Sequence, residues 1–187
     1  TTVENNFKVT PQQIKNAITP KTRLMIFSSP CNPTGSVYIK EELKAMADTL
    51  IPHKEIYIIS DEIYHGLVYE GDAHSILEFT DRAFVINGFS KLYAMTGWRL
   101  GYVIAPKEFV RPMQKIQQNL FISASSFSQW AALAGLRDAE EDVQKMRNTY
   151  DQRRRYLIPR LKALGFGITV EPTGAFYILT NAKRFST

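Results

Sequence analysis

Polar side chains that could do chemistry stand at or just beyond the ends of three predicted strands of this 187-residue chain. They are Asn32 after the first strand, Asp61 at the end of the second, and the pair Ser90-Lys91 after the third. Ligands of open α/β sheets bind beyond the carboxyl ends of parallel strands, so we expect these side chains to converge. Arg99, at the start of a fourth predicted strand, could add a cation.

The chemistry of this set matches the groups of one cofactor. A lysine amine such as that of Lys91 forms a Schiff base with an aldehyde, and a carboxylate such as Asp61 keeps a ring nitrogen protonated. Two further pairs complete the set: Ser90 with Arg99 for a phosphate, and Asn32 with Tyr64 for a phenolate oxygen. Aldehyde, ring nitrogen, phosphate and phenolate together describe pyridoxal 5'-phosphate (PLP).

Each of these features also has a plain structural interpretation. The stretch Asn32 to Gly35 is an ordinary turn sequence, Asp61 could cap a helix, and Trp98-Arg99 could be a surface pair. The prediction of a cofactor site therefore rests on their joint order along the chain.

The elements that must position these residues alternate between strands and helices. The predicted strands cover residues 23–28, 56–60, 83–87 and 100–105, followed by two short ones at 167–170 and 175–179. The predicted helices cover residues 10–18, 41–50, 107–119, 128–136 and 140–164. We expect the first three strands to be parallel neighbours. The fourth should run antiparallel beside the third, because only a short connection separates Lys91 from Arg99. This is an α/β fold, with residues 1–150 as part of a large domain and 151–187 as the start of a small α+β domain.

Composition excludes several classes of function. The net charge of +5 comes largely from a helix in which acidic residues interleave with Arg153–Arg155, which argues against a nucleic-acid surface. His53, His65 and His74 lack metal-ligand spacing, so no metal site is expected. No apolar run approaches the length of a membrane span. A single cysteine, Cys31, fits a reducing cytoplasm.

Four motifs occur in an order that resembles the PLP-dependent aminotransferases of class I/II, which have fold type I, and in particular the branch that is similar to aspartate aminotransferases. The motifs span residues 29–35 (SPCNPTG), 60–64 (SDEIY), 87–91 (NGFSK) and 95–102 (MTGWRLGY). Similarity extends through Glu41-Glu42-Leu43 and Gly174–Tyr177, so it covers nearly the whole chain.

The resemblance implies a role for each candidate residue. Lys91, Asp61 and Tyr64 would be catalytic: Lys91 holds the cofactor and moves a proton, Asp61 pairs with the pyridine nitrogen, and Tyr64 binds the phenolic oxygen. Asn32 would share that oxygen with Tyr64, while Ser90 and Arg99 would anchor the phosphate. The partners implied are an amino acid, a 2-oxo acid and a second copy of the full-length protein.

Two features depart from complete members of the family. Several relatives carry a serine at the position of Gly88, where it contacts the phosphate. The chain also lacks an initiator Met, and we expect it to be a fragment. Segments before Thr1 would supply a phosphate loop and a ring-stacking aromatic, and a segment after Thr187 would supply the arginine for the substrate carboxylate. The fragment alone is therefore expected to be inactive, with open sheet edges.

Three other functions stay open on the sequence alone. A C–S lyase or another fold-type-I PLP enzyme would use the same lysine and aspartate. A regulatory protein could carry an aminotransferase-like domain beside a DNA-binding domain. A degenerate structural homologue is the third, and the retained set Asn32, Asp61, Tyr64, Lys91 and Arg99 argues against it.

Overall fold

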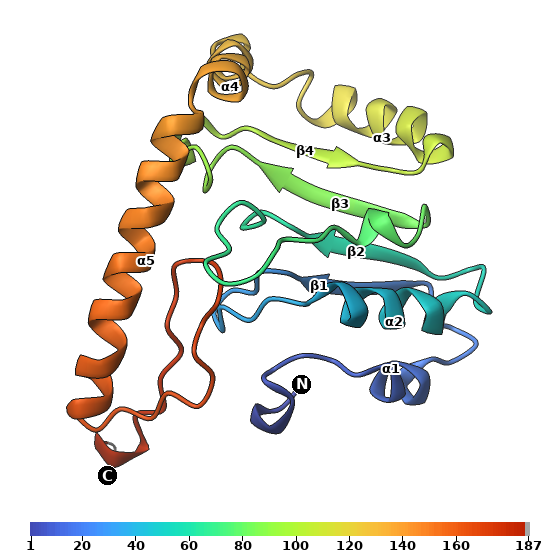
Figure 1. Cartoon of the computed structure of the whole chain (residues 1–187). Coiled ribbons are helices and arrows are strands. Elements are labelled where there is room, and N and C mark those ends of the chain that lie inside the picture. The colour runs from blue at the N-terminus through green and yellow to red at the C-terminus, as the bar shows by residue number, and fades with distance from the viewer. Residues whose placement is uncertain (186–187) are drawn as a thin grey trace.

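The computed structural model of the chain describes residues 1–185. It consists of a four-stranded sheet with helices beside it (Figure 1). The strands are β1 (Leu24–Ser28), β2 (Tyr57–Asp61), β3 (Ala83–Gly88) and β4 (Gly101–Ile104). The helices are α1 (Pro11–Ala17), α2 (Lys40–Leu50), α3 (Lys107–Leu120), α4 (Ser126–Asp138) and α5 (Glu140–Ala163). Short 3-10 turns lie at Val3–Asn5, Ile76–Glu78, Thr96–Trp98 and Lys183–Phe185.

The strand order in the sheet is β1-β2-β3-β4. β1 and β3 both run parallel to β2, whereas β4 runs antiparallel to β3. Asp61, the last residue of β2, lies between Ser28 of β1 and Ile86 of β3. The predicted order and directions are confirmed, and the three parallel strands end at one edge of the sheet.

Local sequence signals account for the first helix. Thr10 caps α1 by accepting the Gln13 backbone N–H, and the Gln13 side chain accepts the Thr10 N–H in return. Pro11 occupies the first helical position, where a missing N–H leaves no helical hydrogen bond unmade. A capping box and a proline therefore fix the start of the helix that the sequence predicts at residues 10–18.

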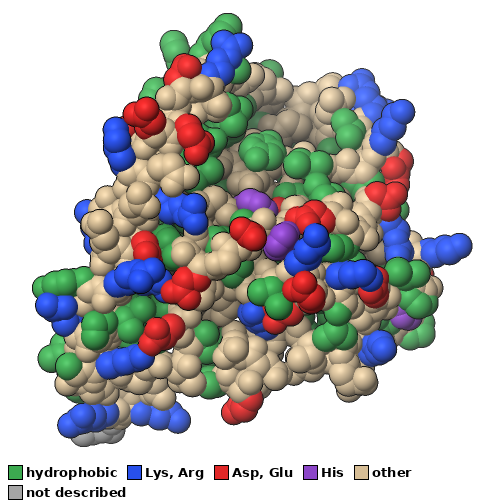
Figure 2. Space-filling view, in the orientation of Figure 1, with side chains coloured by type: hydrophobic (Ala, Val, Ile, Leu, Met, Phe, Trp, Pro, Cys, Tyr) green, Lys and Arg blue, Asp and Glu red, His purple; other side chains and the backbone are tan. Residues whose placement is uncertain are grey.

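Only one face of the sheet is fully covered. The apolar stripe of α2 and the inward residues of β2 and β3 form the main core, which includes Leu43, Met46, Leu50, Ile58 and Val85. The opposite face exposes apolar side chains of three strands: Leu24, Ile26, Ile86 and Val103. Hydrophobic side chains also lie at the surface around α3 and α4 (Figure 2). β1 and β4 are the edge strands, and β4 is exposed throughout, as expected for open sheet edges.

Helix α5 passes the carboxyl ends of β1, β2 and β3. The C-terminal segment lies between α5 and the sheet (Figure 1). The prediction of two short strands at 167–170 and 175–179 is wrong. Only isolated bridges form there, joining Val68 to Gly174 and Gly167 to Asn181. The backbone groups of residues 173–175 bond instead to loops that follow β1 and β2, so no neighbouring strand is available to pair with them.

The predicted domain boundary at residues 150 and 151 falls inside α5, and it stays a prediction. Among residues 1–185, the helices are all too short or too polar to cross a bilayer.

Candidate active site

The loop between β3 and β4 carries three of the predicted site residues. Thr96 joins its two ends, because its hydroxyl donates to the Ser90 carbonyl (2.9 Å) and its own carbonyl accepts from the Arg99 guanidinium (2.9 Å). Ala94 (φ 53°) and Arg99 (φ 54°) both adopt the left-handed conformation, which is unfavourable for residues with a β-carbon. Such strain persists where surrounding structure enforces it, and it is concentrated at functional sites.

The close packing of β3 on β4 accounts for a glycine at position 88, where the family resemblance suggested a serine. It pairs with Gly101 of β4, and a β-carbon at position 88 would lie 2.9 Å from the Gly101 Cα and 3.0 Å from the Leu100 carbonyl oxygen. A serine there requires the two strands to move apart. The missing hydroxyl is thus a consequence of close strand packing.

The amine of Lys91 lies beside two aromatic rings. Its Nζ is 5.9 Å from the centroid of Tyr64 and 5.8 Å from that of Phe176. None of the acidic side chains in residues 1–185 forms an ion pair with it. The amine is therefore held by ring contacts and is not bound to a carboxylate.

Tyr64 stands three residues after Asp61 and is 4% exposed. Its hydroxyl is 2.8 Å from that of Tyr177, and either oxygen can be the donor. Burial raises the pKa of Tyr64 well above its ordinary value, and the hydrogen bond to Tyr177 and the negative charge of Asp61 act in the same direction. Tyr64 is consequently a neutral hydroxyl, able to donate, throughout the physiological pH range.

Asp61 presents one oxygen to the site. Its Oδ1 accepts the backbone N–H of Ile63 (3.1 Å), while Oδ2 has no hydrogen-bond partner among residues 1–185. The negative charge of Asp61 contributes to the raised pKa of Tyr64, so the two side chains lie near each other. A free carboxylate oxygen at the end of a central parallel strand is well placed to bind a cationic N–H.

Asn32 lies in the turn after β1, at the same edge of the sheet. Its side chain is exposed, and within residues 1–185 it forms no hydrogen bond to the other predicted site residues. The structure therefore brings Asp61, Tyr64 and Lys91 together and links Ser90 to Arg99, whereas Asn32 shares only the sheet edge with them.

Phe176 and Tyr177 contact the predicted site residues, although the sequence does not predict them as site residues. Both belong to the short apolar run at 175–179, which is typical of a strand. In the structure the Thr173 and Gly174 N–H groups donate to the Gly35 carbonyl, and the Ala175 N–H donates to the Leu67 carbonyl. These bonds tie the segment to the loops after β1 and β2, so the two aromatic residues reach Lys91 and Tyr64.

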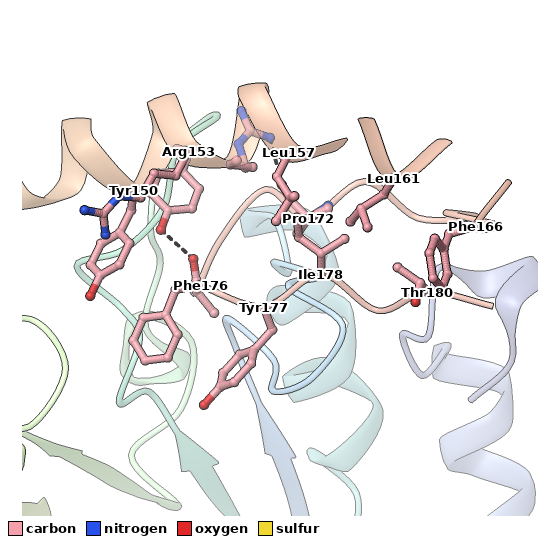
Figure 3. Close-up of a pocket in the computed structure, with 13 residues that line it drawn as sticks. Tyr150, Arg153, Leu157, Leu161, Phe166, Pro172, Phe176, Tyr177, Ile178 and Thr180 are labelled. Carbon is pink, nitrogen blue, oxygen red and sulfur yellow. Dashed lines mark hydrogen bonds between the residues drawn. The ribbon is translucent and has the colours of Figure 1, made fainter. Parts of the chain in front are cut away.

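A cavity of about 560 Å³ lies on the other side of this segment, against α5 (Figure 3). Leu157 and Leu161 point from α5 toward the segment, whereas Phe176 and Tyr177 point away from α5 toward the sheet (Figure 3). The cavity lining contains neither Lys91 nor Asp61, so the cavity is a neighbour of the candidate site and not the site itself.

Arg154 fastens α5 to the same segment. It is 8% exposed, and its guanidinium donates to the Pro172 carbonyl (2.7 Å), to Glu70 (2.6 Å) and to Asp151 (2.8 Å). Asp151 also binds Arg155. Two members of the basic run are therefore paired with acidic side chains, as the interleaved charges predicted.

Comparison with known proteins gives consistent matches along the chain. The family described as aminotransferase class I and II matches residues 1–185. An aspartate aminotransferase of Geobacillus stearothermophilus is 40% identical over 97% of this chain and 47% of its own length. The (5-formylfuran-3-yl)methyl phosphate transaminase of Methanocaldococcus jannaschii is 45% identical over 92% of this chain and 46% of its own length.

Solved structures agree with the sequence matches. An aspartate aminotransferase of Thermus thermophilus with maleate superimposes with a TM-score of 0.95 at 38% identity, covering 100% of this chain and 49% of that one. The chain thus spans about half the length of the curated relatives it matches. These relatives are named for different substrates at similar identity, so the similarity does not select an amino donor.

Proposed function

The chain belongs to the aminotransferase class I and II family, and from that premise we propose that the full-length protein is a PLP-dependent aminotransferase. It would transfer an amino group from an amino acid to a 2-oxo acid. The observation that carries the proposal is the amine of Lys91, which has no ionic partner among residues 1–185 and lies beside the ring of Tyr64, the residue whose hydroxyl is neutral and near Asp61. Family members are generally PLP-dependent, which supports PLP as the cofactor.

The side chains present fit the groups of PLP. An amine without an ionic partner suits an aldehyde, a carboxylate with a free oxygen suits a protonated ring nitrogen, and a neutral phenol suits an oxyanion. A hydroxyl and a guanidinium on one strained loop, those of Ser90 and Arg99, suit a phosphate.

Each residue then has a definite task. When bound, PLP would supply an electron sink for the bonds at the substrate α-carbon. Lys91 Nζ would hold the cofactor and would carry the proton removed from that carbon. The Asp61 carboxylate would accept the pyridine N–H and keep that nitrogen charged. Tyr64, together with Asn32, would donate to the phenolic oxygen, and Ser90 and Arg99 would bind the phosphate.

The other partners of the full-length protein are part of the same proposal. We expect a homodimer, in keeping with the family. The exposed apolar side chains of the segment from α3 to α4, which include Phe121, Ile122, Phe127 and Trp130, are compatible with an interface. The single cysteine supports a reducing cytoplasm as the compartment.

A substrate screen tests the proposal. The full-length protein, supplied with PLP, is incubated with single amino acids and a 2-oxo acid, and the new amino acid is measured. We expect transfer from at least one donor and no transfer by a Lys91→Ala variant. Release of ammonia and a 2-oxo acid without an acceptor would instead identify a lyase, and the absence of both reactions would contradict an enzymatic role.

A further inference from the structure

The hydroxyls of Tyr64 and Tyr177 form a pair within the candidate site, although 113 residues separate them in the sequence. The oxygens are 2.8 Å apart, and the rings meet edge to face at 5.7 Å between centroids. Tyr64 also packs edge to face on Phe176, at 5.2 Å. The Tyr64 hydroxyl therefore has one defined neighbour inside the protein and one direction left for a ligand.

The position of Tyr177 is set by the loops that carry other site residues. Backbone hydrogen bonds join Thr173 and Gly174 to Gly35, and Ala175 to Leu67, on either side of the site. The Tyr177 ring packs in the hydrophobic cluster that contains Tyr64 and Leu67. Tyr177 is thus held near Tyr64 by the backbone hydrogen bonds of the three residues at 173–175 and by the packing of its own ring.

A phenol hydroxyl has one proton and two acceptor lone pairs. If Tyr64 donates to Tyr177, its proton is unavailable to any ligand. If Tyr177 donates to Tyr64, the Tyr64 proton is free to point into the pocket, and the incoming hydrogen bond makes it a stronger donor. An anionic oxygen beside Lys91 favours this second arrangement, because it attracts the Tyr64 proton.

We propose that Tyr177 is a positioning residue, whose hydroxyl donates to the Tyr64 oxygen and thereby directs the Tyr64 proton to the phenolic oxygen of the cofactor. The inference rests on the proposed PLP-dependent function and deepens it. Tyr177 acts only through Tyr64, so its removal should weaken the Tyr64 hydrogen bond without eliminating cofactor binding.

The readout is the pH midpoint of the visible absorbance change of PLP bound to the full-length protein. A donor to the phenolic oxygen stabilises its anionic form and lowers this midpoint. Weakening the Tyr64 donor by Tyr177→Phe should raise the midpoint by about half a pH unit, since losing part of one hydrogen bond is a fraction of the 1.4 kcal/mol that corresponds to a unit. Tyr64→Phe should raise the midpoint further.

Tyr150→Phe is the matched control. The Tyr150 ring packs on Phe176 at 5.5 Å, but its hydroxyl has no hydrogen-bond partner among residues 1–185. This variant removes a hydroxyl from the same aromatic cluster and should leave the midpoint unchanged. The double variant Tyr64→Phe with Tyr177→Phe should shift the midpoint no more than Tyr64→Phe alone, because the second change has nothing left to act on.

A wild-type midpoint in Tyr177→Phe, or additive shifts in the double variant, would overturn the inference. A Tyr177→Phe protein that does not fold would also contradict it, since the role would then be structural. If the wild-type protein forms no bond to PLP at Lys91, the proposed function itself fails. If it does form that bond and Tyr177→Phe changes nothing, only the role of Tyr177 fails.

Discussion

Gly35 is the residue at which the turn after β1 supports the C-terminal segment, and Gly35→Ala tests that support. Its φ of +68° lies in the left-handed region. A β-carbon there would lie 2.2 Å from the Pro172 Cβ and 2.9 Å from the Gly174 carbonyl oxygen. The substitution therefore combines an unfavourable backbone conformation with a collision against backbone and a proline ring, neither of which is flexible.

Gly71 provides the control, because it has a similar φ of +76° but no atoms within 4 Å of an added β-carbon. In both alanine variants the left-handed conformation lowers the free energy of unfolding by roughly 1 kcal/mol. Gly35→Ala must in addition lengthen a contact from 2.2 Å to about 3.5 Å, and overpacking of this kind costs about 1–3 kcal/mol. We expect losses of about 1 kcal/mol for Gly71→Ala and about 2–4 kcal/mol for Gly35→Ala.

The assay has two parts, both on the full-length protein. Urea unfolding followed by circular dichroism measures the two losses of stability. PLP uptake measures the site, because the segment bonded to Gly35 carries Phe176 and Tyr177. We expect uptake to fall in Gly35→Ala only. Equal stability losses in the two variants, or undisturbed uptake in Gly35→Ala, would refute the idea that this turn positions the segment.

Three further predictions concern charge and completeness. Asp61→Ala should reduce turnover by about 100-fold or more and reduce PLP occupancy far less, because the ring nitrogen loses its charged partner; near-normal turnover at saturating PLP would exclude this role. Arg154→Met should lower the free energy of unfolding by about 2–4 kcal/mol, because Glu70 and the Pro172 carbonyl lose their partner, whereas Asp151 keeps its ion pair with Arg155. The exposed neighbour Arg153 should tolerate the same change within about 0.5 kcal/mol, and similar losses at both positions in urea unfolding would contradict the assignment. The 187-residue chain alone should show no transamination and should self-associate through its open sheet edges; turnover comparable to the full-length protein, or a monomer by light scattering, would count against this.

Much of the sheet could be predicted from the sequence, because short apolar runs followed by polar residues mark buried parallel strands and their ends. The antiparallel direction of β4 followed from the short connection between Lys91 and Arg99. The segment after Pro172 could not be predicted in the same way. Its apolar run at 175–179 is typical of a strand, but the backbone of residues 173–175 bonds to Gly35 and Leu67, and only the tertiary fold reveals those partners.

The candidate site was predictable where the chain order constrains it. Asp61 and Lys91 follow neighbouring parallel strands, so their meeting at one edge is a consequence of topology. The contribution of Tyr177 to Tyr64 depends on a contact across 113 residues, for which neither spacing nor composition gives a local signal. The packing of Gly88 on Gly101 is likewise a feature of two paired strands and not of one motif.

The attachment of the cofactor to Lys91 is the central claim, and chemical trapping tests it most directly. The full-length protein is loaded with PLP, reduced with borohydride, digested and mapped by mass spectrometry. We predict a pyridoxyl group on the peptide containing Gly88-Phe89-Ser90-Lys91, with the modification on Lys91 Nζ. A modification found on a different lysine, or no covalent adduct at all in a fully loaded protein, would contradict the account of this site.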